Sequence, residues 1–251
     1  MRARTAPAAA LLAALAATAA PASAPVRVFA AASLGEALRE LAAELEPGGL
    51  GTELNLAGTQ VLRTQIEQGA PAEVYAFADV EDARVLQRRG LVQAPAVFAR
   101  NALCVVTPAA RPRVRALADL AGPGVKVVLA APAVPAGRYA ARVLERLEAG
   151  GLGAGYRGRV LANVVSQETS VRLVLARVAL GEADAGFVYV SDAHGEPRVA
   201  ALTIPAAANV VAEYGIGLVS PRPRAEARAF VQAVLGPAGR RILAARGFAL
   251  P

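Results

Sequence analysis

Ser33 stands where a segment that is apolar except for Arg27, residues 26–30, gives way to an amphipathic pattern over residues 36–46. The periodicities predict a buried strand followed by a helix. With Glu36 three residues later, Ser33 completes an S-x-x-E capping box and is expected to cap that helix. A helix start at the carboxyl end of a strand offers free N–H groups and a partial positive charge. Such a start can hold an anion without any cationic side chain, although a capping serine without a ligand is the simpler interpretation.

The same junction recurs along the chain and brings further candidate donors. Thr59 opens a helix after a predicted strand, and Ala136 follows Pro135, which suits the first position of a helix. Val171 opens another helix, and Tyr189 ends a strand with a hydroxyl that can donate. Carboxyl ends of strands that face each other across a cleft bind ligands in open α/β folds. These helix starts and Tyr189 are therefore the candidate anion site.

The sequence offers few residues for nucleophilic catalysis, metal binding or cofactor binding. His194 is the only histidine, no G-x-S-x-G elbow is present, and His194 is predicted to lie on the surface. Cys104 is the only cysteine and lies in an apolar run, so it is predicted to be buried. Residues 153–158 match G-x-G-x-x-G, but the motif follows a helix and precedes a predicted strand, which favours a loop. Neighbouring carboxylates such as Glu81 and Asp82 are predicted to lie on solvated helix faces.

The N-terminal segment and the composition indicate an exported protein that does not bind nucleic acid. Arg2 and Arg4 precede an apolar Ala/Leu run, and residues 22–24 read A-S-A, so residues 1–24 are predicted to be a signal peptide, with cleavage after Ala19 or Ala22 as alternatives. The net charge is +7, but the arginines are scattered, Lys126 is the only lysine, and aromatic residues make up 4% of the chain. Neither a basic run nor a stacking surface is present, so nucleic-acid binding is not expected.

Strands and helices alternate along the rest of the chain, which predicts parallel sheets in two α/β lobes. Two long strands at residues 101–107 and 209–219 are expected to cross between the lobes, and the last two helices to return to the first lobe. The predicted division is residues 25–103 with 215–251 for one lobe and 104–214 for the other. The remaining predicted strands are residues 53–57, 74–78, 125–131, 160–165, 186–190 and 199–204. The predicted helices after the first span residues 59–68, 79–90, 135–148, 169–180, 225–235 and 238–245.

Several of these segments also carry a family resemblance. The chain resembles the periplasmic molybdate-binding proteins of ABC importers in four stretches: residues 28–34 (VFAAASL), 65–72 (QIEQGAPA), 134–140 (VPAGRYA) and 186–193 (GFVYVSDA). Together with similar spacing, the resemblance covers nearly all of the chain after the predicted signal peptide.

The resemblance implies a two-lobe periplasmic binding protein fold of type II, with a mostly parallel sheet in each lobe and two crossover strands as the hinge. It implies capture of molybdate or tungstate by neutral donors, with no cofactor and no catalysis. Ser33, Thr59 and Tyr189 would donate through hydroxyls, and Ala136 and Val171 through backbone N–H groups. Thr59 stands where the family has a serine. The implied protein is a periplasmic monomer that delivers its ligand to an inner-membrane permease.

Two alternatives remain at this stage. The first is a binding protein for another tetrahedral oxyanion, such as sulfate or phosphate. A phosphate site would benefit from a carboxylate acceptor, and none of the candidate positions is acidic. The second is an enzyme on the same two-lobe scaffold. The sequence shows no catalytic triad, metal cluster or cofactor motif, which argues against an enzyme.

Overall fold

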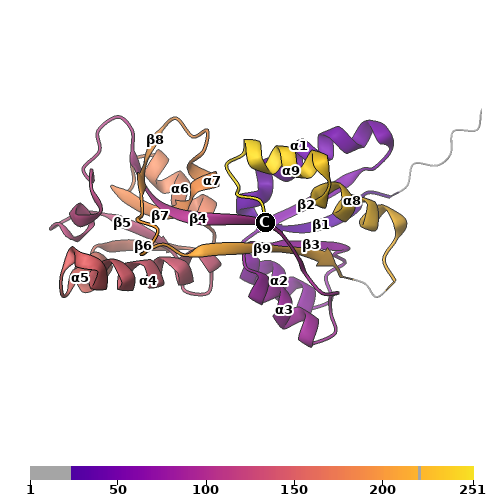
Figure 1. Cartoon of the computed structure of the whole chain (residues 1–251), viewed down its shortest axis with the longest axis horizontal. Coiled ribbons are helices and arrows are strands. Elements are labelled where there is room, and N and C mark those ends of the chain that lie inside the picture. The colour runs from indigo at the N-terminus through magenta and orange to yellow at the C-terminus, as the bar shows by residue number, and fades with distance from the viewer. Residues whose placement is uncertain (1–23, 220–221) are drawn as a thin grey trace, which may run out of the picture.

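The computed structural model describes residues 24–219 and 222–251 and consists of two lobes joined by two long strands (Figure 1). The joining strands are β4 (Ala96–Pro108) and β9 (Val211–Leu218). Apart from Ala24, the predicted signal peptide lies outside the described residues. Within those residues, every helix is too short or too polar to cross a membrane.

The first lobe is built on the parallel strands β1 (Val26–Ala31), β2 (Thr52–Ala57) and β3 (Val74–Phe77). Figure 1 places two groups of helices on opposite sides of this sheet. One group is α1 (Gly35–Leu45), α8 (Ala225–Leu235) and α9 (Pro237–Ala245), and the other is α2 (Thr59–Glu67) and α3 (Val80–Arg88).

The second lobe repeats the plan. Its parallel strands are β5 (Val127–Ala130), β6 (Val164–Glu168) and β7 (Ala185–Tyr189), and β8 (Val199–Thr203) pairs with β4. The helices of this lobe are α4 (Pro135–Leu147) and α5 (Tyr156–Ala162) on one side and α6 (Val171–Ala179) and α7 (Val190–Ala193) on the other. The predicted fold class, two α/β lobes with mostly parallel sheets, is confirmed.

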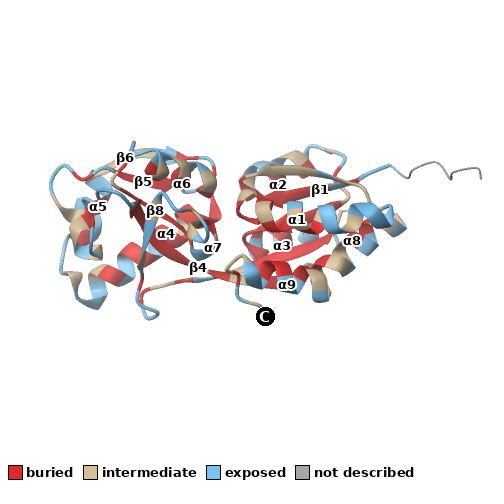
Figure 2. Ribbon diagram, turned by 90° about the horizontal axis from the view of Figure 1, so that it is seen from above, coloured by how far each residue is buried: buried red, intermediate tan, exposed pale blue. Residues whose placement is uncertain are grey.

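Strands β4 and β9 run antiparallel to their neighbours and carry the chain between the lobes. The strand order is β2-β1-β3-β9-β4-β7-β5-β6. The first part of β4, Ala96 to Ala102, pairs with β9, and the later part, from Leu103, pairs with β7 and β8. Buried residues fill the strands and the inner faces of the helices in both lobes, while the outer helix faces are exposed (Figure 2). Each lobe therefore has its own sheet and helix layers, with the carboxyl ends of its parallel strands turned toward the other lobe.

One predicted element is wrong. The segment predicted as strand 160–165 is mostly helix α5, and strand β6 begins only at Val164. Tyr156 and Val160 are four residues apart and both buried, and the Tyr156 hydroxyl donates to the carbonyl of Leu117 at 2.6 Å. The short apolar run therefore follows a helical spacing rather than an alternating one. The G-x-G-x-x-G motif leads into this helix, not into a strand.

Candidate functional site

Ser33, Thr59, Ala136, Val171 and Tyr189 line one small cavity between the lobes. The first two come from the first lobe and the other three from the second. Each of the five residues is at most 8% exposed. The rest of the lining consists of small or apolar residues and one further serine: Ala31, Ala32, Ala57, Gly58, Ala78, Val134, Pro135 and Ser170. Sequence reasoning thus selected residues from five distant segments that the fold brings together.

The size of this cavity limits what it can hold. About 20 Å³ is open to the centre of a water-sized sphere. Treated as a sphere, that space has a radius of about 1.7 Å, and adding the water radius of about 1.4 Å places the wall about 3 Å from the middle. Such a space matches one central atom with a single shell of oxygens and is too small for a sugar or an amino acid.

Ser33 is placed differently from its predicted role as a helix cap. It lies in a 3₁₀ turn, Ala32–Leu34, and the cap residue of α1 is Leu34, with no side-chain cap bond. The predicted capping box is therefore wrong. The Ser33 Oγ instead lies 3.1 Å from the hydroxyl of Tyr214 on β9. The tight turn brings the serine into the cavity, where its hydroxyl has a side-chain partner rather than a helix N–H.

Thr59 opens α2 directly after Gly58, which is the cap residue. The backbone N–H of Ala78 donates to the Thr59 Oγ1 at 3.2 Å. A backbone N–H can only donate, so this bond occupies the oxygen of Thr59 as an acceptor. The hydroxyl proton of Thr59 is then free to point into the cavity.

Ala136 and Val171 lie in the first turns of α4 and α6, where helix N–H groups have no partner within the helix. The α4 start lies against the end of β5. A Cβ on Gly137 would come within 2.2 Å of the Ala131 carbonyl, so only glycine fits this approach. The N-cap position of helix α6 is Ser170, without a side-chain cap bond, one residue after the predicted start at Thr169.

Tyr189 ends β7 and is 1% exposed. Among the described residues its hydroxyl is a buried polar group without a hydrogen-bond partner. Burial raises the pKa of Tyr189 well above its usual value, so the hydroxyl keeps its proton and can donate. A buried hydroxyl without a partner costs free energy, and a ligand oxygen would relieve that cost.

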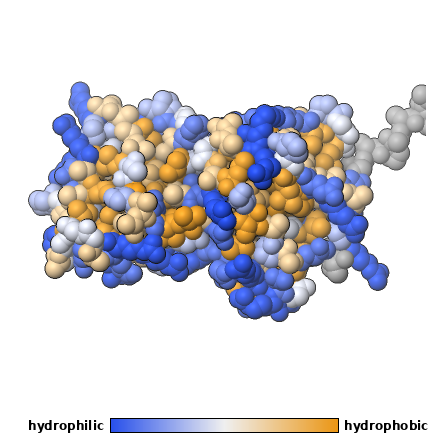
Figure 3. Space-filling view, viewed as in Figure 1, coloured by the Kyte–Doolittle hydropathy of each residue, from blue (hydrophilic) through white to orange (hydrophobic). Residues whose placement is uncertain are grey.

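The cavity contains no charged side chain in its lining. Its donors are hydroxyls and the N-terminal N–H groups of helices, whose dipoles place partial positive charge at the same point. This arrangement suits an anion whose oxygens only accept hydrogen bonds. Figure 3 shows hydrophilic residues running down the middle of the molecule, where the lobes meet, with apolar patches on either side.

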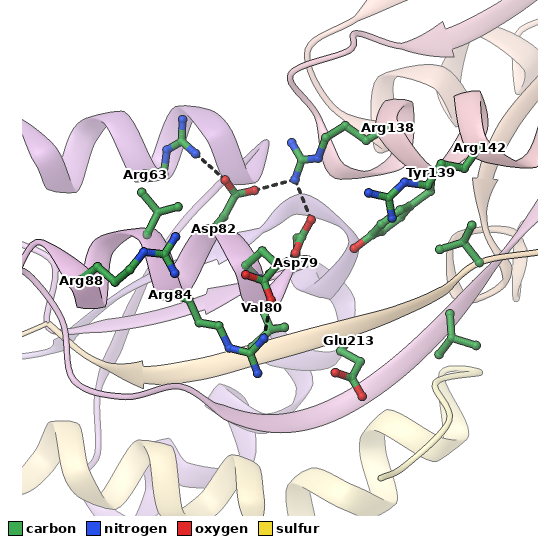
Figure 4. A pocket seen from close by; sticks show the side chains of 14 residues that line it. Arg63, Asp79, Val80, Asp82, Arg84, Arg88, Arg138, Tyr139, Arg142 and Glu213 are labelled. Atoms are coloured by element: carbon green, nitrogen blue, oxygen red, sulfur yellow. Dashed lines mark hydrogen bonds and ion pairs between the residues drawn. The ribbon is translucent and has the colours of Figure 1, made fainter.

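Beside the cavity, charged side chains form ion pairs between the two lobes (Figure 4). Arg138 on α4 donates to Asp79 at 2.6 Å and to Asp82 at 2.9 Å across the lobe boundary. Arg63 donates to the other oxygen of Asp82 at 2.6 Å. Asp82 is only 4% exposed, so the prediction of a solvated helix face is wrong for this residue. We refer to Arg138, Asp79, Asp82 and Arg63 as the inter-lobe ion-pair cluster.

The ion-pair cluster borders an open groove of about 440 Å³, much larger than the cavity. The groove has many charges, but most of them are already paired with one another. The sequence identified Asp79 correctly as the cap of α3, since its side chain accepts from Glu81 N at 2.8 Å. It gave no sign that Arg138 would reach Asp79, because the two residues lie in different lobes.

Two further contacts join the lobes. The Gln60 amide donates to the Thr169 carbonyl at 2.9 Å, and Arg172 donates to Glu36 at 2.6 Å. The backbones also approach closely, since a Cβ on Gly58 would lie 2.4 Å from the Thr169 oxygen. The lobes are therefore in direct contact around the cavity.

Asp192 is a buried carboxylate directly behind Tyr189. One oxygen accepts from the Tyr189 N–H at 3.2 Å, and the other lies 3.8 Å from the Arg172 guanidinium and has no hydrogen bond among the described residues. Burial raises the pKa of Asp192 to about 7, against the opposing effects of Arg172 and the Tyr189 N–H. The folded protein therefore holds a proton on Asp192 at pH values where the unfolded chain has lost it.

This shift predicts how an Asp192→Asn variant responds to pH. Between about pH 4 and pH 7 the folded state binds more protons at this site, so its contribution to stability falls as pH rises. The amide keeps an acceptor for the Tyr189 N–H and cannot ionise. We expect Asp192→Asn to be more stable than wild type by about 4 kcal/mol at pH 8 and by only about 1 kcal/mol at pH 4.5.

Urea denaturation at the two pH values measures this difference. Asp184→Asn is the control, because Asp184 also accepts a backbone N–H, from Lys126 at 2.8 Å, but is only partly buried. It should show no such gain at pH 8. Equal stability of Asp192→Asn and wild type at both pH values would contradict the shifted pKa.

The two other reactive residues lie where the sequence predicted. Cys104 is 3% exposed in the centre of β4, and burial together with Asp192 raises its pKa to about 12, so the thiol is unreactive. His194 is exposed after α7.

Comparisons with known proteins agree with this arrangement. The family model for bacterial extracellular solute-binding proteins matches residues 26–249. The molybdate-binding protein ModA of Mycobacterium tuberculosis is 39% identical over 230 residues, which cover 89% of this chain and 84% of the relative. ModA of Escherichia coli is 30% identical over 236 residues, covering 90% and 89%.

Solved structures share the fold. The periplasmic molybdate-binding protein of Azotobacter vinelandii superposes with a TM-score of 0.77 at 23% identity, covering 90% of this chain and 99% of that one. The sulfate-binding protein SubI of M. tuberculosis gives 0.75 at 19% identity, covering 90% and 86%. The shape alone therefore does not separate the two anions. The family match over nearly the whole described chain, together with a donor-lined cavity between two lobes, shows that the chain belongs to the bacterial extracellular solute-binding protein family.

Proposed function

We propose that this protein captures molybdate in the cavity between its lobes and delivers it to the permease of an ABC importer. The observation that carries the proposal is a cavity of the size of one atom with one oxygen shell, surrounded by neutral donors from both lobes. The relatives named molybdate-binding proteins support the choice of anion. In this proposal the chain is an exported, periplasmic monomer with residues 1–24 as its signal peptide, and its cargo is a ligand rather than a cofactor.

The five predicted residues are the proposed ligands. Ser33, Thr59 and Tyr189 donate hydroxyl protons to the anion, and the helix starts at Ala136 and Val171 donate backbone N–H groups. Each hydrogen bond to a charged oxygen contributes about 1.5–3 kcal/mol, which offsets the cost of removing the dianion from water. Because both lobes supply donors, the anion stabilises the arrangement in which the lobes touch.

The lobe boundaries follow from the two crossing strands. We place residues 25–103 with 215–251 in the first lobe and residues 104–214 in the second, with β4 and β9 as the hinge. The hydrogen bond from Gln60 to Thr169 and the bonds from Arg138 to Asp79 and Asp82 then form on closure and break on opening, whereas the pair of Arg63 and Asp82 stays within the first lobe. The closed shape is the signal that a permease can recognise.

Titration of the purified protein tests the proposed ligand. We expect molybdate and tungstate to bind with similar affinity and sulfate at least about tenfold more weakly, because the donors belong to fixed helix starts and size must then discriminate. Isothermal calorimetry with each anion measures the three constants, with perchlorate as a singly charged tetrahedral control. Sulfate binding as tightly as molybdate would reassign the protein to sulfate, and no binding of any dianion would overturn the proposal.

The ion-pair cluster predicts the effect of an Arg138→Met variant. Without Arg138, Asp79 and Asp82 keep their negative charges at the lobe boundary while the closed form loses two charge-assisted hydrogen bonds. We expect molybdate affinity to fall by about tenfold, mainly through faster release. Calorimetry and stopped-flow displacement measure the two effects.

Arg142→Met is the matched control. Arg142 lies one helical turn further along α4 and also lines the groove, but among the described residues it has neither a hydrogen bond nor an ion pair. Its loss should change affinity less than twofold. An equal loss in both variants would mean that general positive charge at the groove, and not the ion-pair cluster, supports binding.

A further inference from the structure

Four residues with a hydroxyl group line the cavity, and they differ in whether the protein already binds that hydroxyl. The hydroxyl of Ser33 bonds with a tyrosine hydroxyl, and the hydroxyl of Thr59 accepts a backbone N–H. The hydroxyls of Ser170 and Tyr189 have no hydrogen-bond partner among the described residues. A nearly buried hydroxyl without a partner requires an explanation, and for Tyr189 the proposed ligand provides one.

Helix capping is the ordinary role of a serine in the position of Ser170. Ser170 is the N-cap residue of α6, where a serine oxygen usually accepts the N–H of the second or third residue of the helix. Its backbone has the extended conformation of a cap, with φ −151° and ψ 156°, but the side chain makes no cap bond. The helix therefore does not use this hydroxyl.

Ser170 lies in the part of the second lobe that touches the first lobe. The residue before it, Thr169, accepts a hydrogen bond from Gln60 at 2.9 Å, and Arg172 donates to Glu36 at 2.6 Å. Gln60 and Glu36 belong to the first lobe, so Ser170 is held between two inter-lobe bonds. In this arrangement Ser170 is only 9% exposed and borders the cavity. Contact between the lobes therefore encloses Ser170 beside the space that the anion would fill.

Resting on the proposed function, we propose that the Ser170 hydroxyl is a sixth ligand of the anion. A hydroxyl proton can rotate toward an oxygen of the dianion, and among the described residues no acceptor competes for it. Val171 follows directly in the chain and offers its backbone N–H, so two consecutive residues hold the same side of the anion. The second lobe then supplies four ligand residues, from α4, α6 and β7, and the first lobe supplies two.

The contribution of Ser170 depends on its enclosure. When the lobes are apart, water competes both for the hydroxyl and for the oxygens of the anion. When the lobes meet, a hydrogen bond in the enclosed cavity is electrostatically stronger than the same bond in water. Ser170 therefore stabilises the closed, ligand-bound form more than the open form, and its loss should appear mainly as faster release of the anion.

A Ser170→Ala variant tests this role, because it removes the hydroxyl and keeps a residue that fits the extended backbone. We expect molybdate affinity to fall by about tenfold, since one hydrogen bond to a charged group is lost. The urea midpoint of the ligand-free variant should equal that of wild type, because no cap bond is removed. Calorimetry, stopped-flow displacement and urea denaturation measure affinity, release rate and stability.

Thr169→Val is the matched control. It removes a hydroxyl from the neighbouring residue, whose side chain is exposed and outside the cavity lining, and it leaves the backbone carbonyl in place to accept from Gln60. Molybdate affinity and release rate should match those of wild type.

Chemical labelling tests the position of the Ser170 side chain independently of its effect on affinity. The only native cysteine, Cys104, is buried, so a Ser170→Cys variant has one accessible thiol. Saturating molybdate should slow the reaction of this thiol with a methanethiosulfonate reagent. The thiol of a Thr169→Cys variant should react equally fast with and without molybdate.

The outcomes are distinct. Unchanged affinity in Ser170→Ala, an equal loss in Thr169→Val, or a Ser170→Cys thiol that molybdate does not protect would overturn the role of Ser170 and leave the proposed function in place. A lower urea midpoint in Ser170→Ala would make Ser170 a helix cap and would also overturn it. Absence of binding of any dianion by wild type would overturn the proposed function itself. A loss confined to Ser170→Ala, with a normal urea midpoint and a protected thiol, establishes Ser170 as a ligand.

Discussion

Gly58→Ala is expected to weaken molybdate binding by roughly a hundredfold without unfolding the protein. An added Cβ would lie 2.4 Å from the Thr169 carbonyl of the other lobe. Forcing such an overlap costs about 3 kcal/mol, and a tenfold change in affinity corresponds to about 1.4 kcal/mol. The Cβ would also lie 2.6 Å from Gln60 Oε1, but this flexible side chain is held there by its bond to Thr169 and can move away when the lobes separate, so the main cost applies when the lobes touch. Gly58 has φ −63° and ψ 140°, a backbone conformation open to alanine, so the separated lobes should tolerate the change.

Calorimetry and small-angle scattering together test this expectation. Wild type should become more compact as molybdate is added, and Gly58→Ala should not do so at concentrations that saturate wild type. Gly48→Ala is the control, because a Cβ there meets no atom within 4 Å and the position lies outside the cavity. Thermal denaturation of the ligand-free variants should show a difference of at most about 1 kcal/mol. A Gly58→Ala protein that binds like wild type would mean that the lobes do not approach here when ligand binds.

Tyr189→Phe is expected to move affinity and stability in opposite directions. The hydroxyl has no partner among the described residues, so its removal should leave the ligand-free protein equally stable or up to about 1 kcal/mol more stable. The same removal takes one donor from the anion and should weaken molybdate binding by about 1.5–3 kcal/mol, roughly 10- to 150-fold. Urea denaturation without ligand and calorimetry with molybdate measure the two effects.

Tyr156→Phe is the matched control, for which the opposite pattern of stability and affinity changes is expected. Tyr156 is equally buried, but its hydroxyl donates to the Leu117 carbonyl at 2.6 Å. Its loss should lower stability by about 1 kcal/mol and leave molybdate affinity unchanged. If Tyr189→Phe instead behaved like Tyr156→Phe, with lower stability and normal binding, Tyr189 would be a structural residue and not a ligand.

The strand-to-helix junctions could be predicted because their signals are local. The strand from Val26 to Ala31 is apolar and buried except at Arg27, and Pro135 marks the first position of α4 by its own geometry. Asp79 caps the helix that follows it through a bond to Glu81, two residues away. Once these junctions are in place, right-handed parallel connections bring the carboxyl ends of the strands together, and Thr59, Ala136 and Val171 follow as cavity residues.

The errors arise where long-range contacts outweigh local pattern. Ser33 matched a capping box with Glu36, but Glu36 instead binds Arg172 and Arg246 while Ser33 contacts Tyr214. Both outcomes depend on residues more than a hundred positions away. The contact of Asp82 with Arg138 was missed for the same reason, since Arg138 lies in the other lobe. Helix α5 was mistaken for a strand because one buried turn offers too few residues to separate helical from alternating spacing.

The route of β9 has a consequence for how the protein reaches its native state. Strand β3 pairs Val74 with Leu218, and the first part of β4 pairs Ala96 with Ile216. Neither of these pairings can form until β9, near the end of the chain, is available. The strands β5 to β7, in contrast, come from one continuous stretch. Pairings between distant segments form slowly, and unpaired strand edges invite association with other chains. A chain that emerges from a translocation channel N-terminus first would therefore complete the sheet of its second lobe early. The sheet of the first lobe would keep two unpaired strand edges, on β3 and β4, until β9 emerges. Aggregation during folding is expected to be most favoured in the time before β9 pairs.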